Sequence, residues 1–272
     1  ADPKVNNLWP HSSWLYSPIS VDGGARTAQQ YSMCPELLDD TPTIRTIGVY
    51  AHELGHKIGM PDLYDADGSS YGVGNWCLMG LGCWNSGVPG VGIGECPAHL
   101  SAWCKYWLGW MAPTDLTNRD VLQEIPQAET NAFAVKLLFN PGGVNDWPGG
   151  TGEYFLVENR ERTGFDEGLP GEGLLVWHVD EARADTNRSE GHTAATHRMV
   201  DLEEAHGAPQ NLDELPPAGN AGDLGDPFPG ASGKDFWNGV TDPGALLYDG
   251  EDRQLRMSVV STGSEETMVA RF

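Results

Sequence analysis

The chain has 272 residues, enough for one large domain or two subdomains with a real core. Its 16 basic and 39 acidic residues give a net charge of −23, which argues against binding to a nucleic-acid backbone or an anionic membrane surface. It contains no run of about 18 apolar residues, so no transmembrane helix is expected. These properties fit a soluble, secreted protein.

The chain contains five cysteines, namely Cys34, Cys77, Cys83, Cys96 and Cys104. For a secreted protein we expect two disulfides and one unpaired thiol, and reduced buried thiols are the alternative. Cys77 and Cys83 are candidates for one bridge, because a short loop can bring two Cα atoms to within about 6 Å.

The first 40 residues are rich in aromatic side chains and show little periodicity. A turn is predicted at Asp22–Gly24, followed by a short strand over residues 25–33. That strand could be an ordinary sheet strand. It could also border a cleft, where an extended substrate would add to it through main-chain hydrogen bonds.

The clearest helix is predicted over residues 43–58, with Thr41–Thr43 at its start. Apolar side chains recur there at intervals of three and four residues, so one face of the helix is expected to be buried. That stripe consists of Ile44, Ile47, Ala51, Leu54 and Ile58. His52, Glu53 and His56 fall outside the stripe, which favours a role as ligands over a place in the core.

Residues 52–62 read H-E-x-x-H-x-x-G-x-x-D. Histidines four apart on a helix are separated by about 6 Å along its axis, a spacing at which two imidazoles can bind one zinc ion. Glu53 can face the same cleft without being a ligand, and can take a proton from a zinc-bound water. The motif therefore predicts a zinc-dependent peptidase.

The residues after this helix predict a reversal of the chain. Gly59 allows the helix to end in a left-handed conformation, and Pro61 prevents it from resuming. The reversal carries Asp62 back toward the two histidines, where it is expected to be the third zinc ligand.

A methionine follows in the glycine-rich stretch Gly74–Gly80. Its position after the H-E-x-x-H-x-x-G motif indicates the Met-turn of metzincin-type peptidases, with Met79 as an apolar floor below the metal. The intervening Asp65–Ser70 contains two carboxylates and could bind calcium. It lacks a later bidentate glutamate, so a plain turn is predicted.

A second helix is predicted over residues 97–110, and after Pro113 the pattern changes to strands. The predicted strands are Val121–Ile125, Ala132–Phe139, Tyr154–Glu158, Gly173–Val179, Met199–Glu203, Leu255–Val260 and Met268–Phe272. The stretch 181–250 is acidic and rich in glycine and proline, and such a long loop is unusual unless it binds something. Calcium would explain its order. Asn187–Ser189 is a glycosylation sequon.

Taken in order, several stretches resemble secreted metallopeptidases of the immune inhibitor A type. They read HELGHKIGMPDLYDADGSS, GVGNWCLMG, PAHLSAWCKYWLGW, GEYFLVENRER, GEGLLVWHVDE, VDLEEAHG and GDLGDPFPG. An aspartate as third ligand is typical of that family. The resemblance implies an α+β fold with a zincin- or metzincin-like catalytic core, which carries the zinc helix and the Met-turn. This core is expected over residues 1–112, without the family's N-terminal strands, and a β-rich subdomain with long acidic loops over 113–272.

The resemblance also implies structural Ca²⁺, with Asp180, Glu204, Asp223 and Asp226 as candidate ligands. Where the family tends to carry E-A-D-G, this chain has His206 in place of the aspartate. A histidine would weaken a calcium site, because imidazole is a poor ligand for a hard cation. Solvated loop carboxylates are the alternative at each position.

The sequence thus predicts a secreted zinc endopeptidase that hydrolyses proteins or peptides. One Zn²⁺ would be held by His52, His56 and Asp62, and Glu53 would act as general base toward the zinc-bound water. No nucleic-acid or membrane partner is expected, whereas a propeptide or further domains outside this chain are. The alternative is a catalytically silent binding or adhesion module on a zincin scaffold, and the intact Glu53 argues against it.

Overall fold

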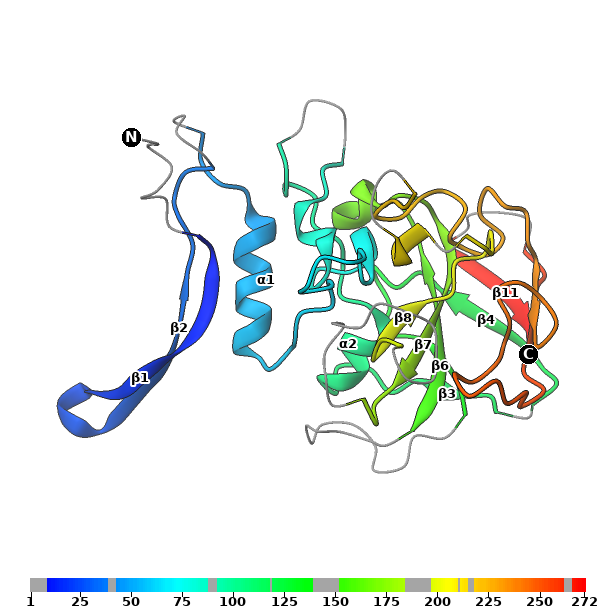
Figure 1. The fold of residues 1–272 in the computed structure, drawn as a ribbon, viewed down its shortest axis with the longest axis horizontal. Coiled ribbons are helices and arrows are strands. Elements are labelled where there is room, and N and C mark those ends of the chain that lie inside the picture. The colour runs from blue at the N-terminus through cyan, green and yellow to red at the C-terminus, as the bar shows by residue number, and fades with distance from the viewer. Residues whose placement is uncertain are drawn as a thin grey trace.

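The computed structural model describes residues 9–38, 43–87, 92–117, 119–138, 152–183, 197–209, 211–214, 218–261 and 266–272. Over these ranges the chain is mixed α/β and consists mostly of strands, as the α+β class requires (Figure 1). No helix within them is long and apolar enough to cross a membrane. The sequon and the predicted helix cap at 41–42 fall outside the described residues.

Besides five short 3-10 helices, the described residues form two α-helices and eleven strands. They are α1 (Ile47–Lys57), α2 (Ala102–Trp107), β1 (His11–Val21), β2 (Arg26–Met33), β3 (Thr114–Asp115), β4 (Leu122–Pro126), β5 (Val135–Leu137), β6 (Glu153–Arg160), β7 (Gly173–Asp180), β8 (Val200–Leu202), β9 (Phe236–Asn238), β10 (Arg256–Val259) and β11 (Thr267–Arg271).

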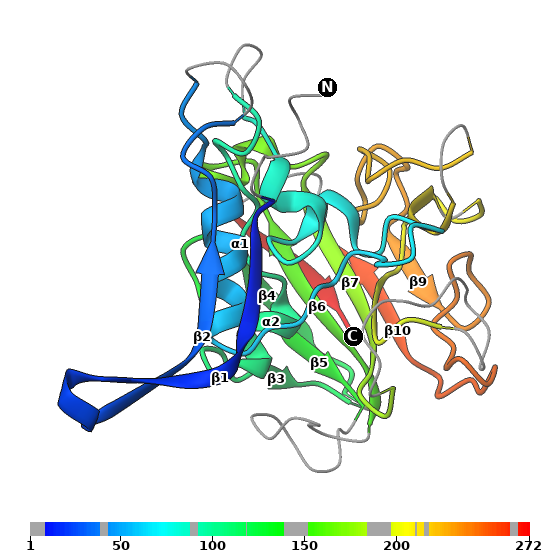
Figure 2. The same cartoon turned by 60° about the vertical axis from the view of Figure 1, so that its left-hand side comes forward.

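The strands form three sheets. β1 and β2 pair alone as an antiparallel hairpin that lies beside α1 and projects beyond it (Figure 2). A five-stranded sheet has the order β3-β5-β6-β7-β8, with β3 and β5 parallel and the other pairs antiparallel. A four-stranded antiparallel sheet has the order β4-β11-β10-β9.

The five-stranded sheet separates two hydrophobic cores, because successive side chains of a strand point to opposite faces. In β6, Tyr154 and Leu156 belong to one core, and Phe155 and Val157 belong to the other. The first core also contains α2 and buried side chains of residues 60–111. The second is shared with the four-stranded sheet. β6 and β7 are thus covered on both faces, as their continuous apolar sequences predict.

Each of the seven strands predicted after Pro113 corresponds to a strand of the structure, and β2 matches the strand predicted at 25–33. The sequence analysis missed β1, β3 and β9. β1 was overlooked because few of its side chains are buried, so its sequence lacks the alternation that a half-buried strand shows. The second helix is shorter than predicted, since Ser101 caps it by accepting a hydrogen bond from the Cys104 amide.

The prediction for the buried face of α1 was wrong. The helix begins at Ile47, and the apolar stripe is largely exposed, with exposed fractions of 53% for Ile47, 61% for Leu54 and 45% for Ile58. The residues that are buried instead are Gly48, Val49, His52, Glu53 and Gly55.

Two glycines explain this inversion. A Cβ atom on Gly48 would lie 1.9 Å from the carbonyl oxygen of Cys83, and one on Gly55 would lie 2.5 Å from Sδ of Met79. The helix therefore packs through its own backbone against the turns at residues 77–84. This close approach is possible only because both residues lack a side chain.

The expected disulfides are not formed, because all five cysteines are free thiols. Cys77 does not face Cys83. Its sulfur lies 3.8 Å from that of Cys104, and it accepts hydrogen bonds from the amides of Met79 and Ser101. The Cys83 thiol donates instead to the carbonyl of Gly80.

Substituting Gly48 by alanine tests the backbone packing of α1. Gly→Ala in a helix normally stabilises a protein by about 0.4–1 kcal/mol. Here we expect Gly48→Ala to destabilise by about 1–3 kcal/mol, because the new methyl group meets a backbone atom that cannot rotate away. Gly55→Ala should cost less, since it meets the flexible end of Met79. Urea unfolding measures the free energy of unfolding of both variants. An unchanged value for Gly48→Ala would contradict this packing.

Candidate metal centre

The C-terminus of α1 forms the predicted reversal through a Schellman motif. The amide of Gly59 donates to the carbonyl of His56, and the amide of Met60 donates to the carbonyl of Gly55. Gly59 has a φ of +101°, a conformation that glycine adopts without strain. The chain then turns back toward the helix, and this turn positions Asp62.

Three side chains converge after the reversal. Oδ1 of Asp62 lies 3.1 Å from Nε2 of His52 and 3.2 Å from Nε2 of His56. Although Oδ1 is buried, it forms no hydrogen bond. Ligand atoms around a tetrahedral zinc ion are separated by about 3.3 Å. The three atoms therefore fit a single zinc-sized cation.

Both imidazoles are held by their other nitrogen. Nδ1 of His52 donates to the carbonyl of Leu78, and Nδ1 of His56 donates to the carbonyl of Met60, each over 2.9 Å. A carbonyl can only accept, so each donating Nδ1 leaves Nε2 with a free lone pair. Metal-binding histidines are commonly oriented by such contacts.

The electrostatics of this group favour positive charge. Burial lowers the pKa of His52, but the contact with the Asp62 carboxylate at 3.1 Å and contacts with neighbouring groups outweigh burial and raise the pKa to about 10. Burial raises the pKa of Asp62, but the two imidazoles hold it far below its usual range. The field that favours a proton at these atoms favours a metal cation equally.

Glu53 lies beside the three convergent side chains without contributing to their group. Only 6% of it is exposed, and its Oε2 is buried without a hydrogen-bond partner. The hydroxyls of Ser12 and Ser32 donate to its main-chain carbonyl over 3.0 and 3.3 Å, so the β1–β2 hairpin is attached to α1 at this residue.

These four side chains line one pocket of about 410 Å³. The start of β1 forms part of its wall, including His11, whereas β2 does not line it. The strand that borders this pocket is therefore β1, and not the strand at residues 25–33 for which a cleft edge was considered.

Tyr64 also lines this pocket, with its ring stacked on His52 at a centroid distance of 6.1 Å. Burial and the nearby Asp62 raise its pKa, so the phenol keeps its proton and can donate a hydrogen bond. The sequence analysis did not identify Tyr64. Its position two residues after Asp62 is the signal that could have indicated it.

Met79 lies directly against α1 at Gly55. Its turn is anchored through Trp76, three residues earlier. The Trp76 indole donates to Asp226 over 2.9 Å, and its carbonyl accepts from Arg160 over 3.1 Å. The position of Met79 therefore depends on residues from the second half of the chain.

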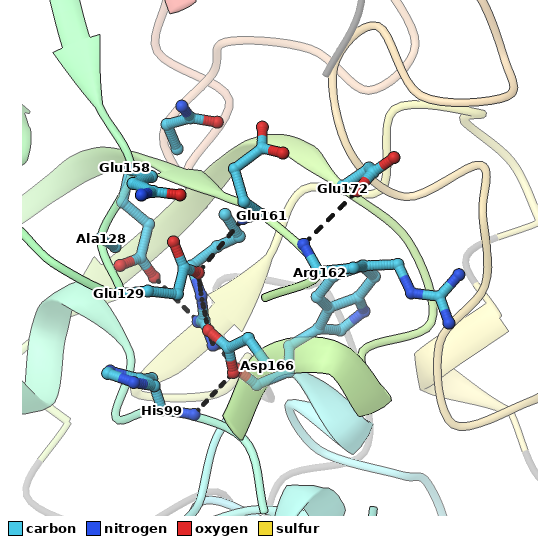
Figure 3. Close-up of polar contacts among 12 residues, drawn as sticks. His99, Ala128, Glu129, Glu158, Glu161, Arg162, Asp166 and Glu172 are labelled. Carbon is cyan, nitrogen blue, oxygen red and sulfur yellow. Dashed lines mark hydrogen bonds and ion pairs between the residues drawn. The ribbon is translucent and has the colours of Figure 1, made fainter. Parts of the chain in front are cut away.

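Arg160 is fully buried among three carboxylates. It donates to Asp166 over 2.7 and 2.9 Å and contacts Glu129 and Glu158 at 3.3 and 3.4 Å. Figure 3 shows Asp166 also accepting from the His99 amide, and Glu129 from the Glu161 amide. This network joins β6 to the segments on either side of α2.

The four candidate calcium ligands do not form one group. Glu204 and Asp226 come together with His206. Asp223 lies in the same loop, where its oxygens accept from Gly225, Asn211 and Asn220. Asp180 instead pairs with His197 over 2.7 Å. Asp65 accepts from Ser69 and Ser70, as the predicted turn requires.

Comparison with known proteins agrees with the motif. Residues 4–111 match the family model of the immune inhibitor A peptidase M6 catalytic domain. The pre-pro-metalloprotease PrtV of Vibrio cholerae serotype O1 is 36% identical over 69 residues, which cover 25% of this chain and 7% of PrtV. Immune inhibitor A of Bacillus thuringiensis subsp. alesti is 36% identical over 97 residues, 31% of this chain and 13% of the relative. The chain thus matches only a small part of either relative.

Replacing Arg160 tests the anchor of the Met79 turn. Arg160→Met removes the cation that pairs with Asp166 and Glu129, while Glu158 keeps its contact with Lys105 at 3.9 Å. Breaking a buried ion pair by removing one partner typically costs about 3–5 kcal/mol. We expect a loss of that size in the free energy of unfolding. Arg162→Met, two residues on at an exposed position, should change it by less than about 0.5 kcal/mol. Equal effects of the two substitutions in urea unfolding would contradict the role of Arg160.

Proposed function

We propose that this chain, whose residues 4–111 match the immune inhibitor A peptidase M6 catalytic domain, is a zinc-dependent endopeptidase acting on proteins. The observation that carries the proposal is the convergence of His52, His56 and Asp62 beside the buried, unpaired carboxylate oxygen of Glu53. The family model and the metalloprotease relatives support a metalloendopeptidase.

The donor set favours zinc. Two imidazole nitrogens and one carboxylate oxygen are ligands that Zn²⁺ accepts, and a catalytic site with three protein ligands keeps a fourth position open. When bound, Zn²⁺ would acidify the attacking water and polarise the scissile carbonyl. Asp62 contributes negative charge, which lowers the acidifying effect of the metal compared with three neutral histidines. The attacking water is therefore less acidic, and its deprotonation depends more on the residue that accepts the proton.

Glu53 is proposed as that acceptor. Its Oε2 is unpaired and faces the pocket, so it can take the proton of the attacking water and then pass it to the leaving amine. Tyr64 keeps its phenolic proton and is proposed to donate a hydrogen bond to the substrate in the same pocket. Met79 is proposed as the Met-turn residue that packs below the histidines.

Three wider features belong to the same proposal. Residues 1–112 would form the catalytic subdomain and residues 113–272 the β-rich subdomain, with the first core drawing side chains from both. The protein would act outside the cell. Calcium would stabilise the acidic loops, with Asp180 and Asp223 as the remaining candidates if the group around His206 prefers another ion.

Glu53→Gln separates catalysis from metal binding. Glutamine has nearly the same shape but cannot accept the proton, so we expect casein cleavage to fall by at least about 100-fold. Zinc content should stay at the parent level, since Glu53 is not part of the convergent group. The parent digest with and without a chelator serves as the control. Cleavage close to the parent rate would show that another group accepts the proton.

Asp62→Ala tests the third ligand. Loss of one of three protein ligands should weaken Zn²⁺ binding by at least about tenfold, because even residues behind the ligands contribute 10–100-fold. Asp67→Ala is the matched control, since this carboxylate is exposed, accepts a local hydrogen bond from the Ser69 amide and does not belong to the convergent group. If isothermal titration gave Asp62→Ala and the parent the same affinity, the third ligand would lie elsewhere.

A catalytically silent binding module would give a different pattern. It would hold zinc but leave casein intact in the parent as well as in Glu53→Gln. The buried Oε2 of Glu53, which has no hydrogen-bond partner, argues against this alternative, because a binding module gains nothing from burying an unsatisfied carboxylate oxygen.

A further inference from the structure

A second cluster of metal-binding side chains lies outside the proposed catalytic pocket. Nε2 of His206 lies 3.4 Å from Oε1 of Glu204 and 3.4 Å from Oδ1 of Asp226. All three possible ligand atoms lie within 4.8 Å of one another. Glu204 follows β8, and Asp226 comes from a loop some twenty residues further along, so the fold brings together groups that are distant in the sequence.

Asp226 points one oxygen into this cluster without a hydrogen-bond partner. The residue is 0% exposed. Its Oδ2 accepts from the Trp76 indole and from the amide of Asp223, each over 2.9 Å. Its Oδ1 forms no hydrogen bond. Burying a carboxylate oxygen in this way is costly unless a cation or donor satisfies it, so this oxygen is suited to bind a cation together with His206, whose Nε2 lies 3.4 Å away.

The other two side chains are held in position by their surroundings. Glu204 is 1% exposed, and its Oε1 accepts from the amides of Asn211 and Leu212 over 2.9 and 3.2 Å. The main-chain carbonyl of His206 accepts from Lys234 over 2.9 Å. The imidazole is partly exposed, so an ion can reach the cluster from solvent at this side.

The spacing and the donor types point to a particular class of ion. The two 3.4 Å separations match the separation of about 3.3 Å between ligands of a tetrahedral zinc ion. Imidazole suits zinc, copper and nickel, whereas calcium and magnesium prefer oxygen alone. Asp223 lies outside this group of three, and its oxygens accept hydrogen bonds from the side-chain amide of Asn211 and the main-chain amide of Gly225.

We propose that Glu204, His206 and Asp226 form a second metal site, which takes a divalent transition ion of the zinc class rather than calcium. Three protein ligands leave room for water as the fourth. Because Asp226 also binds the Trp76 indole, an ion here fixes the 220–226 loop against the segment that leads to Met79. This proposal does not depend on peptidase activity.

Zinc stoichiometry tests the site directly. After equilibration with Zn²⁺ and removal of free metal, elemental analysis of the parent should give two equivalents per chain. A variant with both His52 and His56 replaced by alanine should keep one equivalent, and His206→Ala should also keep one. A parent that binds a single equivalent, lost entirely with the histidines of α1, would overturn the proposal and would leave the catalytic assignment intact.

Replacing His206 by aspartate tests the preference for the ion. His206→Asp makes the cluster all-carboxylate, so Zn²⁺ affinity at this site should fall by at least about tenfold while Ca²⁺ binding appears. His206→Gln, which keeps a polar side chain of similar length, should lose the second zinc without gaining calcium. Isothermal titration with each ion alone measures both. A competition experiment on the parent protein does not depend on the folding of any variant. If millimolar Ca²⁺ displaced the second zinc ion, the assignment to the zinc class would be overturned.

Discussion

Both the side chain and the main chain of Trp76 are held by charged groups from the second half of the chain. The indole donates to Asp226, and the carbonyl accepts from Arg160. Main-chain bonds from Tyr71 to Leu212 and from Asn75 to Ala221 hold the same segment on either side. The turn that brings Met79 under α1 therefore takes its position from the β-rich half. The candidate metal centre, whose three convergent side chains lie within eleven consecutive residues, adjoins a turn that depends on strands and loops far along the sequence.

The short-range chemistry of the centre could be predicted from the sequence, because it follows from local rules. Histidines four apart share a helix face, and a glycine in the left-handed region reverses the chain so that Asp62 meets them. The seven strands of the second half could also be predicted, since burial on one or both faces leaves clear apolar runs.

The packing of α1 could not be predicted, because the helix makes its closest contacts at two glycines, which have no side chain. Hydrophobic periodicity identifies a face that buries large apolar groups, and it gives no signal for a helix that packs through Gly48 and Gly55. β1 gave no signal either, since it is stabilised by pairing with β2 and by contact with α1 rather than by burial. The cysteines were misjudged because their number says nothing about which sulfurs the fold brings together.

Part of the cluster around His206 could be predicted from the sequence. The resemblance implied Glu204 and Asp226 as candidate calcium ligands, and His206 was expected to weaken a calcium site. The further step required coordinates. The imidazole lies 3.4 Å from each of the two carboxylates, and these distances are the basis for proposing that the histidine changes the preferred ion.

The two buried faces of β6 and β7 have a consequence for how this sequence can vary. Inserting or deleting one residue within β6 would exchange its two sets of side chains, sending Tyr154 and Leu156 into the second core and Phe155 and Val157 into the first. Both cores would be disrupted at once, and Arg160 at the end of the strand would turn away from Asp166. Length changes in relatives should therefore be confined to the loops between these strands, and the spacing from Tyr154 to Arg160 should be invariant even where the residues themselves differ.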